Sequence, residues 1–291
     1  MIRSSKHHKR KPNFPQIDPK IKVVDLSDAI EMKQIFPSTA TRQSLEVVES
    51  LDFAVDAFRH DGVIPFNFRL SHENKRKLKK MVDKNTNYRR LNGRLGGPIE
   101  INNDNIDFTI WRQILTPAMT YFITKVYGGC EPYVCSLEII QEQANTPRQK
   151  NHRDHGEGKF QSIAVGFKLD TDDSRYNMFG TRIYKGSHQF RGMSEKNADD
   201  EAEMIQLNHP NIIFDGFSIH GAGEGKRDDK YRLFVTFITA DPSKEGDTHR
   251  EGIYNHYKYD GLKYPLYTIK ELITGKFNPV KTLVKTTSKH A

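Results

Sequence analysis

The chain has little cysteine and no long hydrophobic run. Only two of its 291 residues are cysteines, Cys130 and Cys135. Two are too few for a disulfide framework, so an intracellular, reducing compartment is the expected environment. Their spacing is not CxxC, which excludes a zinc ribbon. No apolar run reaches the roughly 18 residues that a spanning helix requires, and we expect no membrane span.

Acidic residues are missing from both ends of the chain. Residues 1–12 contain five basic residues and residues 276–291 contain four lysines, while the rest of the chain has basic and acidic residues in near balance. The basic start has no apolar segment behind it, so it is not a secretory signal. Tails of this kind contact nucleic acid, anionic membrane or a nuclear import receptor, or are simply solvated. We expect a cytoplasmic protein, and the basic N-terminus would also suit a nuclear one.

Helix signals dominate the first half of the chain. Ser44 is a candidate N-cap for a helix whose apolar residues recur at helical spacing, and Ser71 for the basic segment after it. Between them, residues 63–68 predict a strand. In the segment 115–129, Thr116 fits the N-cap, Pro117 the first helical position and Gly128 the position just past the end.

Strand signals dominate from residue 132 onward. Apolar residues alternate over 133–139 on Tyr133, Cys135, Leu137 and Ile139, and over 163–169 on Ile163, Val165, Phe167 and Leu169. Three more short strands, in 180–188, 211–220 and 231–240, follow without an intervening helix. This pattern favours an antiparallel sandwich or barrel, and we predict an α+β protein with a jelly-roll core.

We divide the chain into four regions on these signals. Residues 1–20 are expected to be a basic disordered arm, and 21–130 a helical and strand region that packs on the core. Residues 131–245 are the predicted jelly-roll core, and 246–291 an extension with a basic tail. Within the core, the polar segment 191–208 fits either a lid or a surface connection with a short helix.

A histidine and an aspartate two residues apart are the first chemical signal. His152 and Asp154 lie in "QKNHRDHGEG", and in an extended segment side chains at i and i+2 point to one side. A third ligand is available in His220, which we place at the end of the apolar strand "IIFDGFSIH". Two histidines and a carboxylate on one face of an ion form the facial triad of non-haem iron(II) oxygenases. Alone the signal is weak, because the chain has 12 histidines.

An arginine on the following strand strengthens the signal. Arg232 lies among apolar residues in "YRLFVTF", and a cation buried there needs an anionic partner. Its planar guanidinium suits a carboxylate held by two hydrogen bonds. The partner is either a ligand or an acidic residue of the fold.

Taken together, these motifs resemble the Fe(II)/2-oxoglutarate-dependent dioxygenases, and among them the phytanoyl-CoA dioxygenase-like group. The resemblance rests on "NHRDH", "GTRIYKGSHQF", "IIFDGFSIHGAGEG" and "YRLFVTF", and on the early "AFRHDGVIPFNFRLSHENKRKL". It covers about residues 45–240. It implies a double-stranded β-helix, and the cofactors Fe(II), 2-oxoglutarate and O2.

The resemblance also implies roles for individual residues. Iron binding falls on His152, Asp154 and His220, and the distal carboxylate of the cosubstrate on Arg232, with Thr236 as a helper on the same strand face. The sequence has Lys185 where the family usually has proline. We expect His188 to be structural and His155 to lie near the site or at the surface.

The chemistry that the resemblance implies is the decarboxylation of 2-oxoglutarate to succinate and CO2, coupled to hydroxylation of an organic substrate. Related halogenases have a small residue in place of the aspartate, so Asp154 favours hydroxylation. A small molecule is the expected substrate; a nucleic-acid base or a basic protein side chain is the alternative that the basic tails suggest. A non-catalytic jelly-roll binding protein and a zinc hydrolase are the other candidates, but the first has no need of His152, Asp154, His220 and Arg232 together, and the second leaves Arg232 unexplained.

Overall fold

We describe a computed structural model of the chain. It describes the following residues: 24–25, 42–68, 70–84, 89–91, 94–98, 108–142, 145–154, 160–169, 181–190, 204–206, 211–223, 230–240 and 266–276. The basic arm 1–12, residues 277–291 of the basic tail, His155 and most of the segment 191–208 lie outside these ranges.

Twelve strands in the described residues form two sheets. The larger has the order β1-β2-β9-β6-β11-β5-β4-β3, with β12 also paired to β5, and the smaller has the order β10-β7-β8. All pairs are antiparallel except β1 with β2. The strands of the larger sheet are β1 (Val24–Asp25), β2 (Val63–Asn67), β3 (Arg89–Leu91), β4 (Arg94–Pro98), β5 (Tyr133–Glu142), β6 (Phe160–Lys168), β9 (Asn211–Asp215), β11 (Lys230–Ala240) and β12 (Tyr267–Thr268). Those of the smaller are β7 (Thr181–Tyr184), β8 (Met204–Gln206) and β10 (His220–Ala222).

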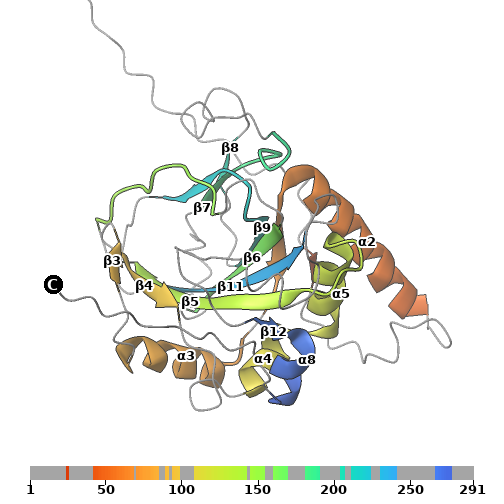
Figure 1. Ribbon diagram of the computed structural model, residues 1–291, viewed down its shortest axis with the longest axis horizontal. Coiled ribbons are helices and arrows are strands. Elements are labelled where there is room, and N and C mark those ends of the chain that lie inside the picture. Colours follow the sequence, from red (N-terminus) through yellow and green to blue (C-terminus); the bar gives the residue numbers. More distant parts are fainter. Residues whose placement is uncertain are drawn as a thin grey trace, which may run out of the picture.

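Helices cover one side of the larger sheet, and the smaller sheet lies on its other side (Figure 1). Helices α3, α4 and α8 lie below the sheet in this view, and α2 and α5 lie at one end of it. The described helices are α2 (Arg42–Asp61), α3 (His72–Lys84), α4 (Phe108–Ile114), α5 (Pro117–Val126) and α8 (Ile269–Thr274).

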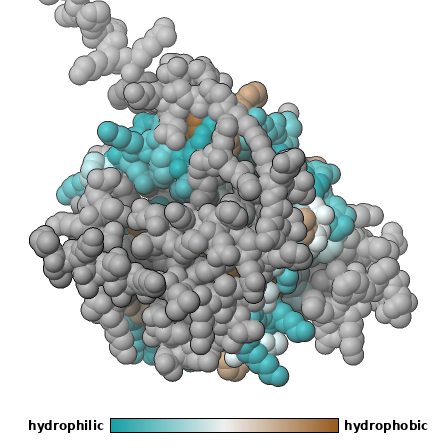
Figure 2. Space-filling view, in the orientation of Figure 1, coloured by the Kyte–Doolittle hydropathy of each residue, from teal (hydrophilic) through white to brown (hydrophobic). Residues whose placement is uncertain are grey.

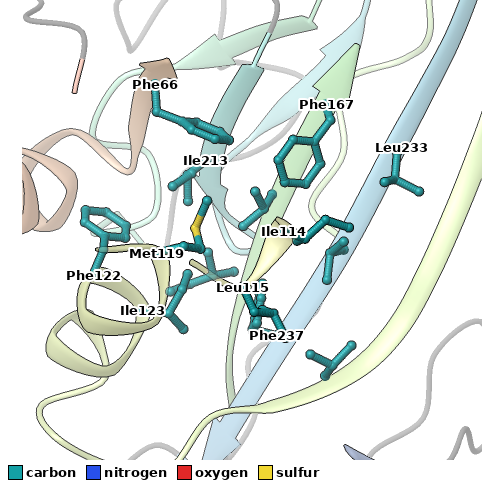
Figure 3. Close-up of a cluster of buried hydrophobic side chains, with 14 of the residues drawn as sticks. Phe66, Ile114, Leu115, Met119, Phe122, Ile123, Phe167, Ile213, Leu233 and Phe237 are labelled. Atoms are coloured by element: carbon teal, nitrogen blue, oxygen red, sulfur yellow. The ribbon is translucent and has the colours of Figure 1, made fainter. Parts of the chain in front are cut away.

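The main hydrophobic core lies between the helices and the larger sheet. Alternate residues of β11 on this face, among them Leu233 and Phe237, are fully buried against apolar residues of α4 and α5. Figure 3 shows Met119 and Ile123 on the side of α5 that faces the strands, and Phe122 packs edge to face against Phe58 of α2. Burial of such side chains contributes about 1.5–3 kcal/mol each, so this face fixes the larger sheet in place.

A second, smaller cluster lies between the two sheets. It contains Ile183 of β7 and residues of β2, β6 and β9, and Phe234 of β11 packs against it. Because side chains alternate across a strand, Arg232 and Thr236 of β11 face the same side as Phe234. We call this side of the larger sheet the inner face.

Most of the predicted helix signals are confirmed. Thr116 Oγ1 accepts a hydrogen bond from the backbone N–H of Met119, Pro117 is the first residue of α5, and Gly128 follows the end with φ of +65°. Ser71 Oγ accepts from the backbone N–H of Asn74 at the start of α3. The prediction for Ser44 is wrong, because α2 begins at Arg42 and Ser44 lies inside the helix.

The alternation predicted for β5 needs correction. In β5, Thr236 lies opposite Ser136 but Phe237 lies opposite Val134, so Cys135 is an extra residue in the ladder. This bulge turns Val134 rather than Tyr133 or Cys135 to the main core beside Leu137 and Ile139. In the segment 191–208, the described residues 204–206 form strand β8, and the prediction of a lid or a short helix falls on residues outside the described ranges.

Large hydrophobic side chains are scarce on the described surface. Phe53, Phe108 and Phe190 are the ones that are exposed, and the described residues visible in Figure 2 are mostly hydrophilic. Among the described helices, none is long and apolar enough to cross a membrane.

Candidate metal centre

The segment around His152 runs beside the first residue of β10. The backbone N–H of His152 donates to the carbonyl of His220 at 2.9 Å, and the N–H of His220 donates back at 2.9 Å. Two residues further on, the N–H of Asp154 donates to the carbonyl of Gly216 at 3.0 Å. These three hydrogen bonds hold the segment extended, so the side chains of His152 and Asp154 project to one side.

Three side chains converge on one point as a result. One ligand atom each of His152, Asp154 and His220 lies within 4.8 Å of the other two. Asp154 Oδ1 lies 3.6 Å from His152 Nε2 and 3.4 Å from His220 Nε2. These are the three residues that the sequence predicted would meet, although its placement of His220 was wrong. His220 begins a separate strand, β10, and this strand pairs in the smaller sheet, not at the end of β9.

Both imidazoles are oriented for metal binding by their other ring nitrogen. His152 Nδ1 lies 2.9 Å from the carbonyl oxygen of Lys150, and His220 Nδ1 lies 2.9 Å from that of Ser218. A carbonyl oxygen only accepts, so each Nδ1 carries a proton and each Nε2 is the ring nitrogen left to bind a metal. Carbonyl oxygens play this orienting role at many metal-bound histidines, so this donor set fits a divalent transition metal.

The carboxylate of Asp154 is held in its charged form. Withdrawal from water would raise its pKa, but the electrostatic attraction of His220 and the hydrogen bonds to the imidazoles of His152 and His220 outweigh that effect and lower the pKa well below its ordinary value. The side chain is 31% exposed, whereas that of His220 is 8% exposed. The side chain of His152 is 32% exposed, so the open side of the site lies next to Asp154 and His152.

Arg153, the residue between two candidate ligands, ties the segment to two turns. Its guanidinium donates to the carbonyl oxygens of Ser187, Phe217 and Phe190, and it lies over the ring of Phe217. Its side chain points away from those of its two neighbours, as alternation requires. Sequence reasoning missed it, although an arginine between two ligands is a signal that the opposite side of the segment is anchored.

Gln149 and Arg182 anchor the segment from the other end. The backbone N–H and the side-chain oxygen of Gln149 both bond to Ala222 of β10, each at 3.0 Å. Arg182 of β7 donates to the carbonyl oxygen of Gln149 at 3.1 Å. Gly221 allows this close approach, because a Cβ there would lie 3.2 Å from the carbonyl oxygens of Gln149 and Lys150. None of these residues stood out in the sequence.

The turn before β10 is fixed by residues of the Gly-Ser-His motif. Ser187 Oγ accepts from the backbone N–H of Ile219, one residue before His220. His188 is not among the converging side chains; its Nε2 lies 2.9 Å from the carbonyl oxygen of Arg59. Lys185, which stands where the family usually has proline, forms an ion pair of 3.1 Å with Asp61. The motif thus joins the end of α2 to the turn that carries His220.

Arg232 lies on the inner face, linked to the triad by two aromatic rings. Its guanidinium carbon is 6.0 Å from the centroid of Phe234; that ring is 6.4 Å from Phe214, which is 4.7 Å from the ring of His220. The arginine is 5% exposed. Thr236 is on the same face, but four residues of strand separate it from Arg232 by about 13 Å, and its role as a helper stays a prediction.

Comparisons with known proteins identify the fold but no family. No family model matches the chain, and no curated protein matches it significantly. Among solved structures, it is similar to "the epimerase SnoN in complex with Fe3+, alpha ketoglutarate and nogalamycin RO", with a TM-score of 0.53 and 13% identity over 75% of this chain and 99% of that one. A second structure of SnoN, described as a non-heme alpha ketoglutarate dependent epimerase, gives a TM-score of 0.51 and 13% identity over 70% and 95%.

A likeness at this identity establishes the fold. The chain has the double-stranded β-helix, the cupin-like jelly roll expected from the sequence, with helices packed outside it. The α+β prediction is confirmed. The narrower resemblance to the phytanoyl-CoA dioxygenase-like group stays a prediction.

Proposed function

We propose that the protein is an Fe(II)- and 2-oxoglutarate-dependent dioxygenase that hydroxylates a small organic substrate. The observation that carries the proposal is the convergence of His152, Asp154 and His220 within 4.8 Å, with both Nε2 atoms presented to one point. Two histidines and one carboxylate bind one face of an iron ion and leave the opposite positions open. SnoN, whose structure in complex with Fe3+ and alpha ketoglutarate is similar to this chain, has the same fold.

Each residue of the triad has a separate task in this proposal. His220, with its side chain 8% exposed, supplies a fixed ligand, and the more exposed Asp154 supplies a negative charge next to the open side. When bound, iron and the oxo-acid together supply the activation of O2, with succinate and CO2 as products. The chain supplies geometry, charge and exclusion of water.

The inner face supports an anchor for the distal carboxylate. Arg232 on β11 lies directly opposite Lys168 on β6, so two cationic residues face the same side. A carboxylate bound beside this pair would accept hydrogen bonds from both cations. Phe214 and Phe234 occupy the space from this pair toward His220, where they would exclude water from the bound acid. A zinc hydrolase has no use for such an anchor.

Hydroxylation is the outcome we assign to the substrate. The carboxylate ligand Asp154 leaves no space for a halide beside the metal, in contrast to the related halogenases. SnoN is described as an epimerase, so the product must be analysed directly: hydroxylation adds one oxygen atom to the substrate, and epimerisation adds none. The substrate is to be found by measuring succinate release against lipids, amino acids, peptides and nucleosides.

Anaerobic binding of Fe(II) and 2-oxoglutarate tests the proposal before any substrate is known. We expect the wild type to develop the weak visible charge-transfer band of an iron-bound oxo-acid. Asp154→Ala should lose the band at the same iron concentration, and Arg232→Met should require at least tenfold more 2-oxoglutarate to develop it.

Matched substitutions at exposed positions provide the controls. Asp56→Ala and Arg76→Met remove the same charges away from the site and should behave as the wild type. A wild type without the band, or one that binds Zn(II) in its place and hydrolyses esters, would overturn the assignment.

A further inference from the structure

The segment 69–94, which we call the basic segment, carries a large positive charge. It contains ten basic and two acidic residues, a net charge of +8 that equals the net charge of the whole chain. The two tails are basic as well, so the residues outside these three stretches are acidic as a group. Helix α3 and the strands β3 and β4 make up most of the basic segment, and they therefore concentrate positive charge on one part of the fold.

Helix α3 uses its apolar residues for packing and leaves cations on its outer side. Six of the ten basic residues belong to α3, whose Leu78 is fully buried in the main core. Arg76 and Lys80 are exposed, and because they are four residues apart they lie on the same side of the helix, about 6 Å from each other along its axis. Glu73, the acid of the first turn, forms an ion pair of 3.1 Å with Lys77. The outer side of α3 therefore has a net positive charge.

The strand register places further basic residues at the same end of the larger sheet. Arg89 and Arg90 belong to β3, the last strand of that sheet. Lys79 Nζ of α3 lies 5.0 Å from the ring centroid of Tyr231, near the start of β11. Through the pairing of β11 with β5, of β5 with β4 and of β4 with β3, Tyr231 is in one row with Arg90, three strand spacings or about 14 Å away. Figure 1 shows α3 below β3 and β4.

The chemistry of this surface suits a nucleic acid better than a membrane. Helices that bind a membrane surface bury large apolar side chains in the lipid, whereas the exposed ones among the described residues, Phe53, Phe108 and Phe190, all lie outside the basic segment. Lysine and arginine bind phosphate oxygens. A nucleic-acid strand presents one negative charge for each 3.4 Å of helix axis, and α3 spreads its cations over about 20 Å. A continuous row of anions of this length is typical of nucleic acids.

We propose that the basic segment is a binding surface for the phosphate backbone of a nucleic acid. Contacts to phosphate carry no direct information on base sequence, so binding is expected to be independent of sequence and to weaken steeply with salt. Helix α3 lies on the helical side of the larger sheet, and the candidate metal centre lies on the other side. The surface is therefore separate from the proposed function and does not depend on it.

Salt-dependent binding of labelled DNA, as a single strand and as a duplex of about 20 nucleotides of mixed sequence, tests this surface on the full chain. Arg76→Gln with Lys80→Gln removes two exposed cations of α3. We expect binding to weaken about tenfold at low salt. The slope of log K against log salt should fall by about 1.8 for the duplex or about 1.4 for the single strand, because each lost phosphate contact removes about 0.9 or 0.7.

Two matched variants provide the controls. Lys125→Gln with Lys270→Gln removes two exposed cations of α5 and α8 and changes the net charge equally, and it should keep the wild-type slope. Arg76→Lys with Lys80→Arg exchanges the side chains but keeps both charges, and it should bind as the wild type does. The melting temperature and the anaerobic band with Fe(II) and 2-oxoglutarate should be those of the wild type in every variant, so the proposed function is tested separately.

Four results would overturn the inference. The first is a wild type that binds neither DNA at low salt. The second is an equal loss in the two glutamine variants, which would show that net charge and not α3 decides binding. The third is an equal loss in the variant that keeps both charges, which would assign the effect to the fold. The fourth is binding to phosphatidylserine vesicles that falls in the α3 glutamine variant while DNA binding does not change.

Discussion

Asp215 is a buried acid at the turn that leads to His220. Its carboxylate accepts a hydrogen bond from the backbone N–H of Phe217 at 2.7 Å. Burial raises the pKa of Asp215 above its ordinary value, although the hydrogen bond from Phe217 and the positive charges of His188 and Arg153 oppose this shift. The folded protein therefore favours the neutral acid more than the unfolded chain does.

This shift predicts a pH-dependent effect of Asp215→Asn on stability. A raised pKa contributes stability that is fully present below the unfolded pKa, about 3.9, and is lost as pH rises through the folded pKa. Asparagine keeps the acceptor for Phe217 but has no proton to lose. The melting temperature of the variant relative to wild type should therefore rise between pH 4 and pH 7.

The same measurement on Asp56→Asn serves as control. Asp56 is an exposed residue of α2, and its substitution should produce no trend with pH. A difference between wild type and Asp215→Asn that is constant over this range would show that Asp215 has no shifted pKa.

At this scale the sequence predicted the three residues that converge but not those that position them. His152, Asp154 and His220 stood out because their residue types and spacing are those of metal ligands. Gln149 and Arg182 act through their distance to one backbone segment, and that distance arises only when β7 and β10 pair. No local pattern encodes it.

Gly62 joins an entire helix to the strand that follows it. It lies between α2 and β2 with φ of +73°, and a Cβ there would lie 2.4 Å from His188 Nδ1 and 2.6 Å from Ser218 Oγ. Gly62 therefore lies close to His188 of the Gly-Ser-His motif and to Ser218 of the turn before β10. A side chain at this position would displace the turn that carries a candidate ligand.

We predict that Gly62→Ala destabilises the fold by about 2–5 kcal/mol, because it adds overpacking of about 1–3 kcal/mol to a left-handed backbone cost of about 1–2 kcal/mol. Gly128→Ala isolates the second cost, since Gly128 has φ of +65° and nothing within 4 Å of the added Cβ. It should cost about 1–2 kcal/mol. Denaturant unfolding measures both, and equal losses in the two variants would show that the contact with His188 does not matter.

Element prediction succeeded where local chemistry decides the outcome. The caps of α3 and α5 use side chains within three residues of the helix start, so their signal is in the sequence. The bulge at Cys135 is a property of two strands that are about 100 residues apart, β5 and β11, and strict alternation could not reveal it. His220 was assigned to the wrong strand because the turn over 216–219 has apolar residues that continue the pattern of β9.

None of the described core residues or triad residues belongs to the charged ends of the sequence. Both hydrophobic clusters and the triad lie between residues 51 and 273. Nine of the 45 basic residues belong to the two tails, 1–12 and 276–291. We therefore expect the tails to be separable from the candidate metal centre by truncation.

Removal of residues 1–12 and 277–291 should leave the melting temperature and the binding of Fe(II) with 2-oxoglutarate unchanged. Retention on a polyanion such as heparin or single-stranded DNA should fall, together with the slope of its salt dependence, because fewer cations neutralise the polyanion. Identical retention of the full and truncated chains at every salt concentration would exclude the tails as a nucleic-acid contact.

The triad and the proposed carboxylate anchor belong to different layers of the molecule. The candidate metal ligands are on β10 and the segment beside it, whereas Arg232 is on the larger sheet, with Phe214 and Phe234 in between. If the proposed function holds, the size of these two aromatic rings sets the length of the oxo-acid that fits between the metal site and Arg232. Substitution of Phe214 and Phe234 by smaller or larger side chains could then change the preferred length of the diacid. The residues that bind its two ends would stay the same.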